Sequence, residues 1–370
     1  MQQLAFEQFD RAAPILEAIS HHTVLRTILA GSTPGQVYVN DPAHPTIAFA
    51  QFKHRAFISG DPGGIERDRL RQFFTHDVIV NCKRSDVPLF RLTADDPAWN
   101  QILTDVLNEQ QPILAGYQCF SIDLTKNFHE TKIPPGFTVQ HVTKTLVHQD
   151  FQGRDDLLDE MCSERESVDA FIENSFGIAA FEDEVLAGWC LSEYNHENRC
   201  EVGIATLPPF QHQGLAKAMT CAFLALAKEN GISNVLWHCF KSNEASRRTA
   251  LSAGFHLIED EQVLMVYLDP AIHLAVHGNL QFEKGEYPQA LTWYQQALQE
   301  DHPQAWIAWN AACSAAHLGR IELAFNYLNQ AVDLGFSDLD HLVRSEHLAE
   351  LKSDARWGTL ITRLNQNLPS

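Results

Sequence analysis

The residues from Gln211 to Ala216 have the types and spacing of an anion-binding turn. Their sequence, Gln-His-Gln-Gly-Leu-Ala, lies between a strand-like run, 201–207, and a helix-like run, 215–230. The first N–H groups of a helix have no intrahelical partner, and the helix dipole makes that end weakly positive. Gly214 lets the backbone approach a ligand closely, and Ala216 keeps the first turn free of bulk. The pattern predicts a site for an anion such as a pyrophosphate; the alternative is an ordinary glycine turn before a helix.

A second segment of interest begins at Asn243 and ends with Gly254-Phe255, and its first and last residues indicate the ends of a helix. Asparagine is favoured at a helix N-cap, so one interpretation of Asn243 is that it starts the helix 244–253. Gly254 is then the residue that ends this helix, with a positive φ. A capping role does not prevent Asn243 from also contacting a ligand.

The elements that must position these two segments follow a regular order along the chain. A boundary at 131–136 is followed by a strand, helical material, three strands joined by short turns, and then an alternation of helix and strand. A β-α-β crossover should place the strand 234–240 parallel to 201–206. The predicted elements are strands 137–142, 177–181, 185–194, 200–206, 234–240, 255–258 and 262–267, and helices within 157–176, 215–230 and 244–253.

The turn Gln-x-x-Gly-x-Ala, the segment from Asn243 and this order of elements together resemble the GNAT acetyltransferases. The segments 35–41, 201–206 and 237–239 are further similar to the branch that includes zwittermicin-resistance acetyltransferases. The resemblance implies an α/β (α+β) GNAT fold, with a mixed central sheet flanked by helices. It also implies an acetyl-CoA-dependent N-acetyltransferase, an acyltransferase with an amine-bearing small-molecule or peptide acceptor. Direct transfer to the amine is favoured, because no cysteine lies in a recognisable Cys/His arrangement.

The resemblance also implies which residues bind acetyl-CoA. The backbone at 204–206 would bind the pantetheine amides where the sheet opens, the turn would bind the pyrophosphate, and the Asn243 segment would line the rest of the CoA arm. Ala250 stands where the family often has a tyrosine that protonates the CoA thiolate, so the general acid is unassigned. The predicted CoA-binding residues are Ile204, Ala205, Thr206, Gln211, His212, Gln213, Gly214, Leu215, Ala216, Asn243 and Ser246.

The reaction that the resemblance implies needs a base to deprotonate the acceptor amine. Glu201 is the candidate, because it opens the strand before the turn, and burial beside an apolar strand would raise its pKa. The alternative for Glu201 is an ordinary exposed strand glutamate. Glu193, on the neighbouring strand, is the second candidate, and His238 is a third, although a strand histidine is more often structural.

We expect three domains: an N-terminal α/β domain over 1–130, with short strands that include 78–81, the GNAT domain over 131–269, and an all-α domain over 270–370. In the last, Gly285, Ala290 and Ala297 are followed 34 residues later by Gly319, Ala324 and Ala331. Repeats of that period in helical sequence resemble TPR helix pairs. This TPR-like domain could bind a protein partner.

The composition of the chain excludes several classes of protein. The formal net charge of −20 argues against nucleic-acid binding, which depends on Lys and Arg. No apolar run is long enough for a membrane span, and the N-terminus has no secretory signal. The eight cysteines form no Cys-x-x-Cys pair, which favours reduced thiols and a cytoplasmic protein, and no metal-binding spacing occurs, so no metal is expected. The alternative function is a CoA-binding or inactive GNAT scaffold that acts as a TPR-mediated protein-interaction module.

Overall fold

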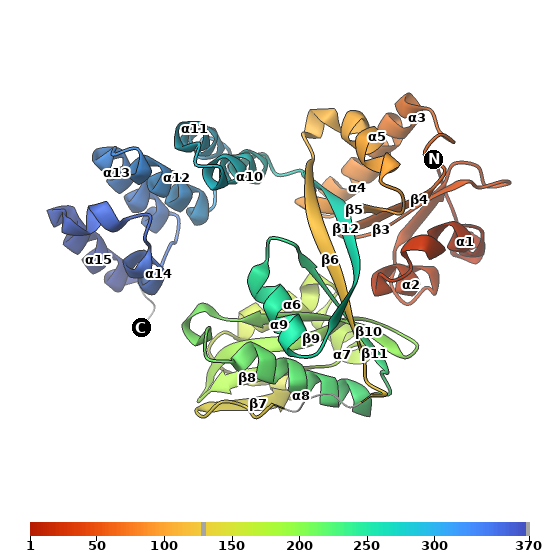
Figure 1. Cartoon of the computed structure of the whole chain (residues 1–370), viewed down its shortest axis with the longest axis horizontal. Coiled ribbons are helices and arrows are strands. Elements are labelled where there is room, and N and C mark those ends of the chain that lie inside the picture. The colour runs from red at the N-terminus through yellow and green to blue at the C-terminus, as the bar shows by residue number, and fades with distance from the viewer. Residues whose placement is uncertain (127–130, 368–370) are drawn as a thin grey trace. The chain divides into compact units, whose positions relative to one another are not determined.

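The computed structural model describes residues 1–126 and 131–367, whose strands form one mixed sheet (Figure 1). The order across the sheet is β1-β2-β3-β4-β5-β12-β6-β11-β10-β9-β8-β7. The strands are β1 (Gln2–Gln3), β2 (Gln36–Val39), β3 (Ile47–Phe52), β4 (Arg55–Gly60), β5 (Leu89–Ala94), β6 (Ile113–Asp123), β7 (Phe137–His141), β8 (Gly177–Glu182), β9 (Val185–His196), β10 (Arg199–Thr206), β11 (Asn234–Phe240) and β12 (His256–Tyr267).

The helices divide between the sheet-containing part of the chain and a C-terminal helical part. Those of the first part are α1 (Ala13–Leu16), α2 (Thr23–Leu29), α3 (Arg67–Phe73), α4 (Ile79–Arg84), α5 (Ala98–Val106), α6 (Arg154–Ser163), α7 (Val168–Asn174), α8 (Leu215–Glu229) and α9 (Glu244–Ser252). Those of the second part are α10 (Pro270–Glu283), α11 (Tyr287–Ala297), α12 (Ala305–His317), α13 (Ile321–Asp333), α14 (Leu339–Arg344) and α15 (Ala355–Asn367).

The long strands β6 and β12 join the two halves of the sheet. They run side by side through the middle of the sheet-containing part (Figure 1) and pair antiparallel, and β6 also pairs with β11. Contacts group Met1–Val266 into one compact unit and Tyr267–Ser370 into another. The boundary predicted at residue 130 falls on 127–130, which lie outside the described residues. A separate N-terminal domain therefore stays a prediction.

Helix α8, which was expected after the turn, forms because its apolar residues lie on one face that packs on the sheet. Leu215, Met219 and Phe223 recur every four residues, so they share one face, and all three are buried against β8, β9 and β10. The helix begins directly after Gly214 and ends at Glu229, followed by the C-cap Asn230 and by Gly231, which has a positive φ. The crossover through α8 pairs β10 with β11 in parallel, which confirms the predicted pairing, and β8, β9 and β10 pair antiparallel.

The structure differs from the predicted elements in two places. The expected strand 78–81 is helical, because Phe74, Val78 and Cys82 are four residues apart and bury one helix face. The two final predicted strands are one strand, β12, whose register with β6 shifts between Leu257 and Glu259. Such a bulge lets a strand continue through a local irregularity.

The C-terminal unit repeats one helix-pair pattern. Gly285 and Gly319, in the turns after α10 and α12, both have positive φ, at 77° and 67°. The alanines at equivalent positions of α11 and α13 are fully buried, which lets the helix backbones approach closely. These alanines are Ala290, Ala297, Ala324 and Ala331. The helical character expected for this region is therefore present.

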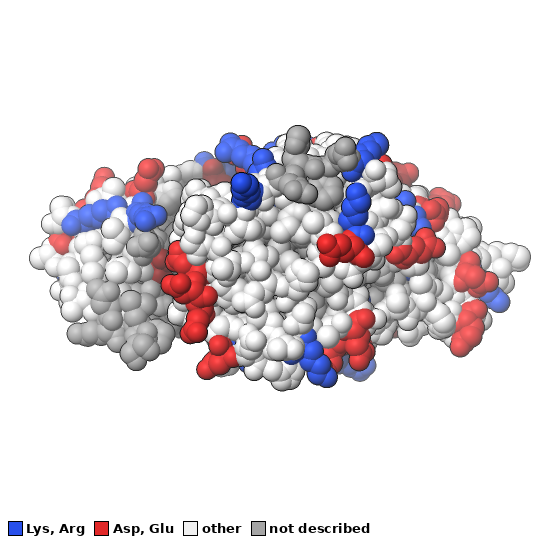
Figure 2. All heavy atoms as spheres, turned by 90° about the horizontal axis from the view of Figure 1, so that it is seen from below, with Lys and Arg blue, Asp and Glu red and all other residues white. Residues whose placement is uncertain are grey.

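Two observations concern the helices and the charged surface. Within the described part of the chain, no helix combines the length and the apolar character needed to cross a membrane. Figure 2 shows one face on which Lys and Arg side chains are interspersed with Asp and Glu and do not merge into a continuous basic surface.

Candidate functional site

A wedge opens in the sheet where β10 and β11 part. Residues Arg199–Val202 of β10 pair with Asn234–Trp237 of β11, but the rest of β10, Gly203–Thr206, pairs only with β9 among the described strands. The backbone edge of Ile204, Ala205 and Thr206 that faces β11 is therefore available to a ligand. This is where the sequence predicted that the sheet would open.

The turn at 211–214 lies beside this wedge and carries free backbone N–H groups. His212 and Gly214 have φ angles of 61° and 78°, in the left-handed region, and Leu215 begins α8. Among the described residues, no hydrogen bond engages the N–H groups of His212, Gln213 or Gly214. A Cβ placed on Gly214 would meet no heavy atom within 4 Å, so the space beside it is open. Free N–H groups at a helix N-terminus favour an anion there.

The Gln211 side chain makes a hydrogen bond that holds this turn in place. Its side-chain Nε2 donates to the backbone oxygen of Thr206, at 2.9 Å, which ties the turn to the end of β10. The structure thus gives Gln211 a positioning contact within the protein.

Asn243 and Ser246 lie at the start of α9. Asn243 Oδ1 accepts from the Ser246 N–H at 3.0 Å, which confirms the N-cap interpretation. Ser246 Oγ in turn accepts from Trp237 Nε1 at 2.9 Å, so its hydroxyl hydrogen remains available for donation. Ala250 is fully buried in the core and does not line the cavities described here, whereas Thr249 does. A tyrosine at position 250 would have to enter that core.

These segments form the walls of a groove with a volume of about 500 Å³. All the predicted CoA-binding residues except Gln213 line it. The lining is Ile204, Ala205, Thr206, Phe210, Gln211, His212, Gly214, Leu215, Ala216, Lys217, Trp237, Asn243, Ala245, Ser246, Arg248 and Thr249.

A second cavity, of about 260 Å³, adjoins the groove. The two share Ile204, Trp237, Asn243 and Ser246, so they meet at the point where β10 and β11 part. The rest of its lining is strongly charged and holds both candidate bases. It comprises Arg55, Arg91, Tyr117, Glu160, Glu164, Glu193, Glu201, Val202, Gly203, His238, Cys239 and Phe240. We call it the carboxylate cavity.

One buried guanidinium organises this cavity. Arg55, on β4, is 4% exposed, and its two terminal nitrogens donate to three carboxylates from the other half of the sheet-containing unit. Nη1 donates to Glu201, and Nη2 donates to Glu193 at 2.6 Å and to Glu164 at 3.1 Å. Burial alone would lower the pKa of Arg55, but the three carboxylates outweigh it and raise that pKa, so Arg55 stays charged.

A β-bulge brings Glu193 beside Glu201. Glu201 pairs with Tyr194 of β9, while the next residue, Val202, pairs with Ser192, so Glu193 is the extra residue on β9. A Cβ on Gly203 would lie 2.1 Å from Glu193 Oε1, so this carboxylate rests directly over Gly203.

The carboxylates differ in their electrostatics. Burial raises the pKa of Glu193 well above its usual value, and the Glu164 carboxylate raises it further against the opposing effect of Arg55. Burial would also raise the pKa of Glu164, but Arg55, His54 and a hydrogen bond from Tyr194 Oη, at 2.6 Å, outweigh it and leave that pKa well below its usual value. Of these groups, Glu193 is therefore the carboxylate whose proton affinity suits a general base.

Glu201 and His238 lie deeper in the cavity wall. Glu201 is 1% exposed, and its Oε2 lies 3.9 Å from His238 Nε2. Burial lowers the pKa of His238 well below its usual value, and the neighbouring His22 and Arg55 lower it further. His238 is therefore a neutral imidazole, and its Nε2 lies 3.3 Å from Cys119 Sγ.

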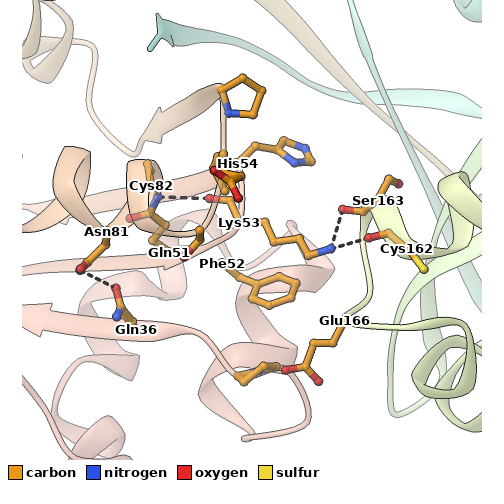
Figure 3. A pocket seen from close by; sticks show the side chains of 15 residues that line it. Gln36, Gln51, Phe52, Lys53, His54, Asn81, Cys82, Cys162, Ser163 and Glu166 are labelled. Atoms are coloured by element: carbon orange, nitrogen blue, oxygen red, sulfur yellow. Dashed lines mark hydrogen bonds between the residues drawn. The ribbon is translucent and has the colours of Figure 1, made fainter. Parts of the chain in front are cut away.

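A third cavity, of about 530 Å³, lies beside the β3–β4 turn (Figure 3). Lys53 crosses it to reach the end of α6, where its Nζ donates to the backbone oxygens of Cys162, Ser163 and Arg165. His54 also lines this cavity, and its Nε2 lies 3.3 Å from Glu164 Oε1 in the carboxylate cavity. No predicted site residue lines this third cavity in the described chain.

The described residues bring one group of side chains close enough to hold a metal ion. His22 Nε2 lies 3.0 Å from Glu261 Oε1, and His21 Nε2 lies 3.4 Å from Glu261 Oε2. The expectation that the protein binds no metal stays a prediction.

Comparisons with known proteins identify the family. The model of the family described as GNAT acetyltransferase matches residues 13–264. The chain belongs to the GNAT acetyltransferase family. The match begins at residue 13, so it includes the strand that carries Arg55.

Two similar proteins agree with this assignment. The Uncharacterized N-acetyltransferase YdfB of Bacillus subtilis (strain 168) is 24% identical over 266 residues, which are 70% of this chain and 96% of that protein. A solved structure, the GCN5-related N-acetyltransferase-like protein from Streptococcus suis 89/1591, is similar with a TM-score of 0.54 at 18% identity, covering 70% of this chain and 98% of that one. The structural likeness confirms the GNAT fold.

Membership of the GNAT family implies acetyl-CoA, and the groove fits this co-substrate. The observations are the three free N–H groups at 212–214 and the open space beside Gly214, which suit a pyrophosphate. The free edge of 204–206 offers hydrogen-bonding groups of the kind that a pantetheine chain can use.

Several side chains that line the carboxylate cavity were missed by sequence reasoning. Arg55 and Arg91 come from the N-terminal part of the chain, where no motif was found, and Glu164 comes from the loop after α6. A signal was present for Arg91, because it is a lone cation within a short apolar strand, and buried charges need partners. Arg55 gave no such signal, because it directly follows Lys53 and His54. The remaining missed side chains are Tyr117 and Glu160.

Proposed function

We propose that this chain is an acetyl-CoA-dependent N-acetyltransferase whose acceptor amine binds in the carboxylate cavity. The observation that carries the proposal is the junction of the groove and the carboxylate cavity at Ile204, Trp237, Asn243 and Ser246. A donor bound in the groove and an acceptor bound in the cavity would meet there. Such positioning converts a bimolecular reaction into an effectively intramolecular one.

The proposal assigns the donor to the groove. Acetyl-CoA supplies the acetyl group as an activated thioester. The N–H groups at 212–214 would bind its pyrophosphate, and the backbone of 204–206 would orient the pantetheine chain along the free edge of β10. Asn243 and Ser246 would contact the same arm where α9 begins.

We propose Glu193 as the general base, in place of Glu201. Glu193 is the more exposed of the two side chains, at 16% against 1%, and its pKa is raised. Glu193 would accept the proton that the amine loses as its nitrogen bonds to the acetyl carbon. Glu201, held against Arg55, would then keep that guanidinium in place and act as a positioning residue.

The proton for the departing sulfur has two candidate sources in the cavities. The Ser246 hydroxyl lines both of them and has a hydrogen to donate. Tyr117 lines the carboxylate cavity, and burial raises its pKa, so its phenol remains protonated. Either group, or water, would complete the transfer without a tyrosine at position 250.

We also propose that the C-terminal unit is a TPR-like surface for a protein partner. The 34-residue spacing of Gly285 and Gly319, with buried alanines at matching positions, supports it. If the chain bound acetyl-CoA but transferred no acetyl group, this unit would favour the alternative of an interaction protein.

Acetyl-CoA titration of a pair of glycine variants tests the donor site. Gly214→Glu places bulk and negative charge at the proposed pyrophosphate site, so we expect affinity measured by calorimetry to fall at least about 100-fold. Gly231→Glu is the matched control, because Gly231 follows the other end of α8, has a similar φ of 79°, and also has no heavy atom within 4 Å of a Cβ. The control corrects for strain at a left-handed residue.

Equal affinity in Gly214→Glu and the wild-type protein would contradict the donor assignment. Release of CoA in the presence of amines tests turnover. An absence of both acetyl-CoA binding and CoA release would refute the proposed function as a whole.

A further inference from the structure

Arg91 is a mostly buried cation whose guanidinium makes no hydrogen bond or ion pair among the described residues. It lies on β5, is 9% exposed, and lines the carboxylate cavity. Its guanidinium carbon lies 4.3 Å from the ring centre of Tyr117. A buried charge is normally paired, so an unpaired one in a cavity indicates a ligand of opposite charge.

The neighbouring arginine shows the contrast. Arg55 and Arg91 are register partners on the parallel strands β4 and β5. The two terminal nitrogens of Arg55 donate to Glu164, Glu193 and Glu201, whereas the guanidinium of Arg91, which also lines the cavity, donates to no described residue. The Arg55 guanidinium therefore binds carboxylates of the protein itself, and the Arg91 guanidinium remains available to a ligand.

Because of its position, the Arg91 guanidinium is available to the acceptor and not to the donor. Arg91 lines the carboxylate cavity but not the groove, so the phosphates of a donor in the groove are not its partner. The same cavity holds the Glu193 carboxylate, whose Oε1 makes no hydrogen bond among the described residues. One small cavity thus offers a cation-binding group and an anion-binding group to the same molecule.

We propose that the acceptor is a small amino acid, whose carboxylate binds Arg91 and whose amine faces Glu193. This inference rests on the proposed function. A guanidinium matches a carboxylate with two parallel hydrogen bonds, which fixes the orientation of the acceptor. The cavity volume of about 260 Å³ limits the acceptor to a small molecule.

A panel of matched acceptors tests the requirement for a carboxylate. The probes are glycine, β-alanine, L-glutamate, L-phenylalanine and L-lysine, each beside its carboxamide, and turnover is measured as CoA released from acetyl-CoA. We expect at least one free acid to be acetylated, with a kcat/KM about 100-fold above that of its carboxamide, because the amide removes the charge that Arg91 binds.

Substitution of Arg91 tests whether this residue binds the carboxylate of the acceptor. Arg91→Gln should lower kcat/KM about 100-fold for the acid, mainly through KM, and leave kcat/KM for the carboxamide nearly unchanged. Arg91→Lys keeps the charge but loses the paired hydrogen bonds, so we expect an intermediate loss. Arg69→Gln, which removes an exposed arginine of α3, is the control and should match the wild-type protein.

Thermal unfolding and acetyl-CoA titration of each variant separate a folding defect from a binding defect. Equal use of acids and carboxamides, or an equal effect of Arg91→Gln on both, would overturn the inference while the proposed function stands. Binding of acetyl-CoA without acetylation of any of the probes would also overturn the inference. Failure of acetyl-CoA to bind the wild-type protein would instead overturn the proposed function.

Discussion

The substitution Gly203→Ala tests the catalytic geometry with a single methyl group. The added Cβ would lie 2.1 Å from Glu193 Oε1, which would have to move about 1.3 Å to reach 3.4 Å, where ordinary van der Waals contact begins. The carboxylate would then leave the position in which Arg55 holds it at 2.6 Å. Because Gly203 does not have a positive φ, alanine fits the backbone, and the perturbation is confined to the side chain of Glu193.

The expected effect on catalysis is large and the effect on stability is small. A displacement of about 1 Å in a catalytic group can cost about 100-fold in rate, which is about 2.7 kcal/mol of activation free energy. Replacing glycine by alanine in a strand contributes roughly 0.5–1 kcal/mol to stability, which offsets part of the strain. We therefore expect kcat to fall about 100-fold while the midpoint of thermal unfolding changes little.

The assay is CoA release at saturating acetyl-CoA, with two comparisons. Gly63→Ala is the matched control, because its Cβ would meet its nearest neighbour at an ordinary 3.4 Å, and it should retain the wild-type kcat. In a protein that already carries Glu193→Gln, Gly203→Ala should cause little further loss, because both changes act on the same group. A wild-type kcat in Gly203→Ala, or a full additional loss in the double variant, would refute the role given to Glu193.

Two further predictions concern the charges of the cavity. Arg55→Ala leaves Glu164, Glu193 and Glu201 buried without their cation, so it should lower the free energy of unfolding by about 3–5 kcal/mol in urea titrations, whereas Arg67→Ala, which breaks the exposed pair with Asp105, should change it by at most about 1 kcal/mol. A similar small loss in both would contradict the buried cluster. The base must be deprotonated to act, so kcat/KM should rise with pH through the raised pKa of Glu193, above the usual 4.5, and Glu193→Gln should lose this rise. An unchanged pH profile in that variant would assign the base elsewhere.

The turn and the helix cap could be predicted from the sequence because their causes are local. Gly214 takes a left-handed conformation next to the first turn of α8, and Asn243 caps α9 through a residue three positions away. Neither feature depends on distant parts of the chain. The parallel pairing of β10 and β11 was also predictable, since the handedness of a β-α-β crossover allows one arrangement.

The helical conformation of 78–81 and the buried position of Ala250 could not be predicted in the same way. Each depends on which face of a short segment the rest of the protein covers. The apolar residues around Val78 fit a strand or a helix until the packing of Phe74 and Cys82 is known. The comparison of Ala250 with a catalytic tyrosine likewise assumed that position 250 faces the groove, which in the structure is lined by Thr249.

By itself, the sequence determined the local features of the proposed donor site: the turn, the cap and the order of strands and helices around them, because these follow from the conformational preferences of adjacent residues. Only the tertiary structure decided the carboxylate cavity, where we propose that the acceptor binds. Arg55 reaches Glu201 across 146 residues of chain, and a bulge in β9 brings Glu193 beside them. The pKa of each carboxylate is set by its burial and by the charges around it, so it cannot be read from neighbours in the sequence.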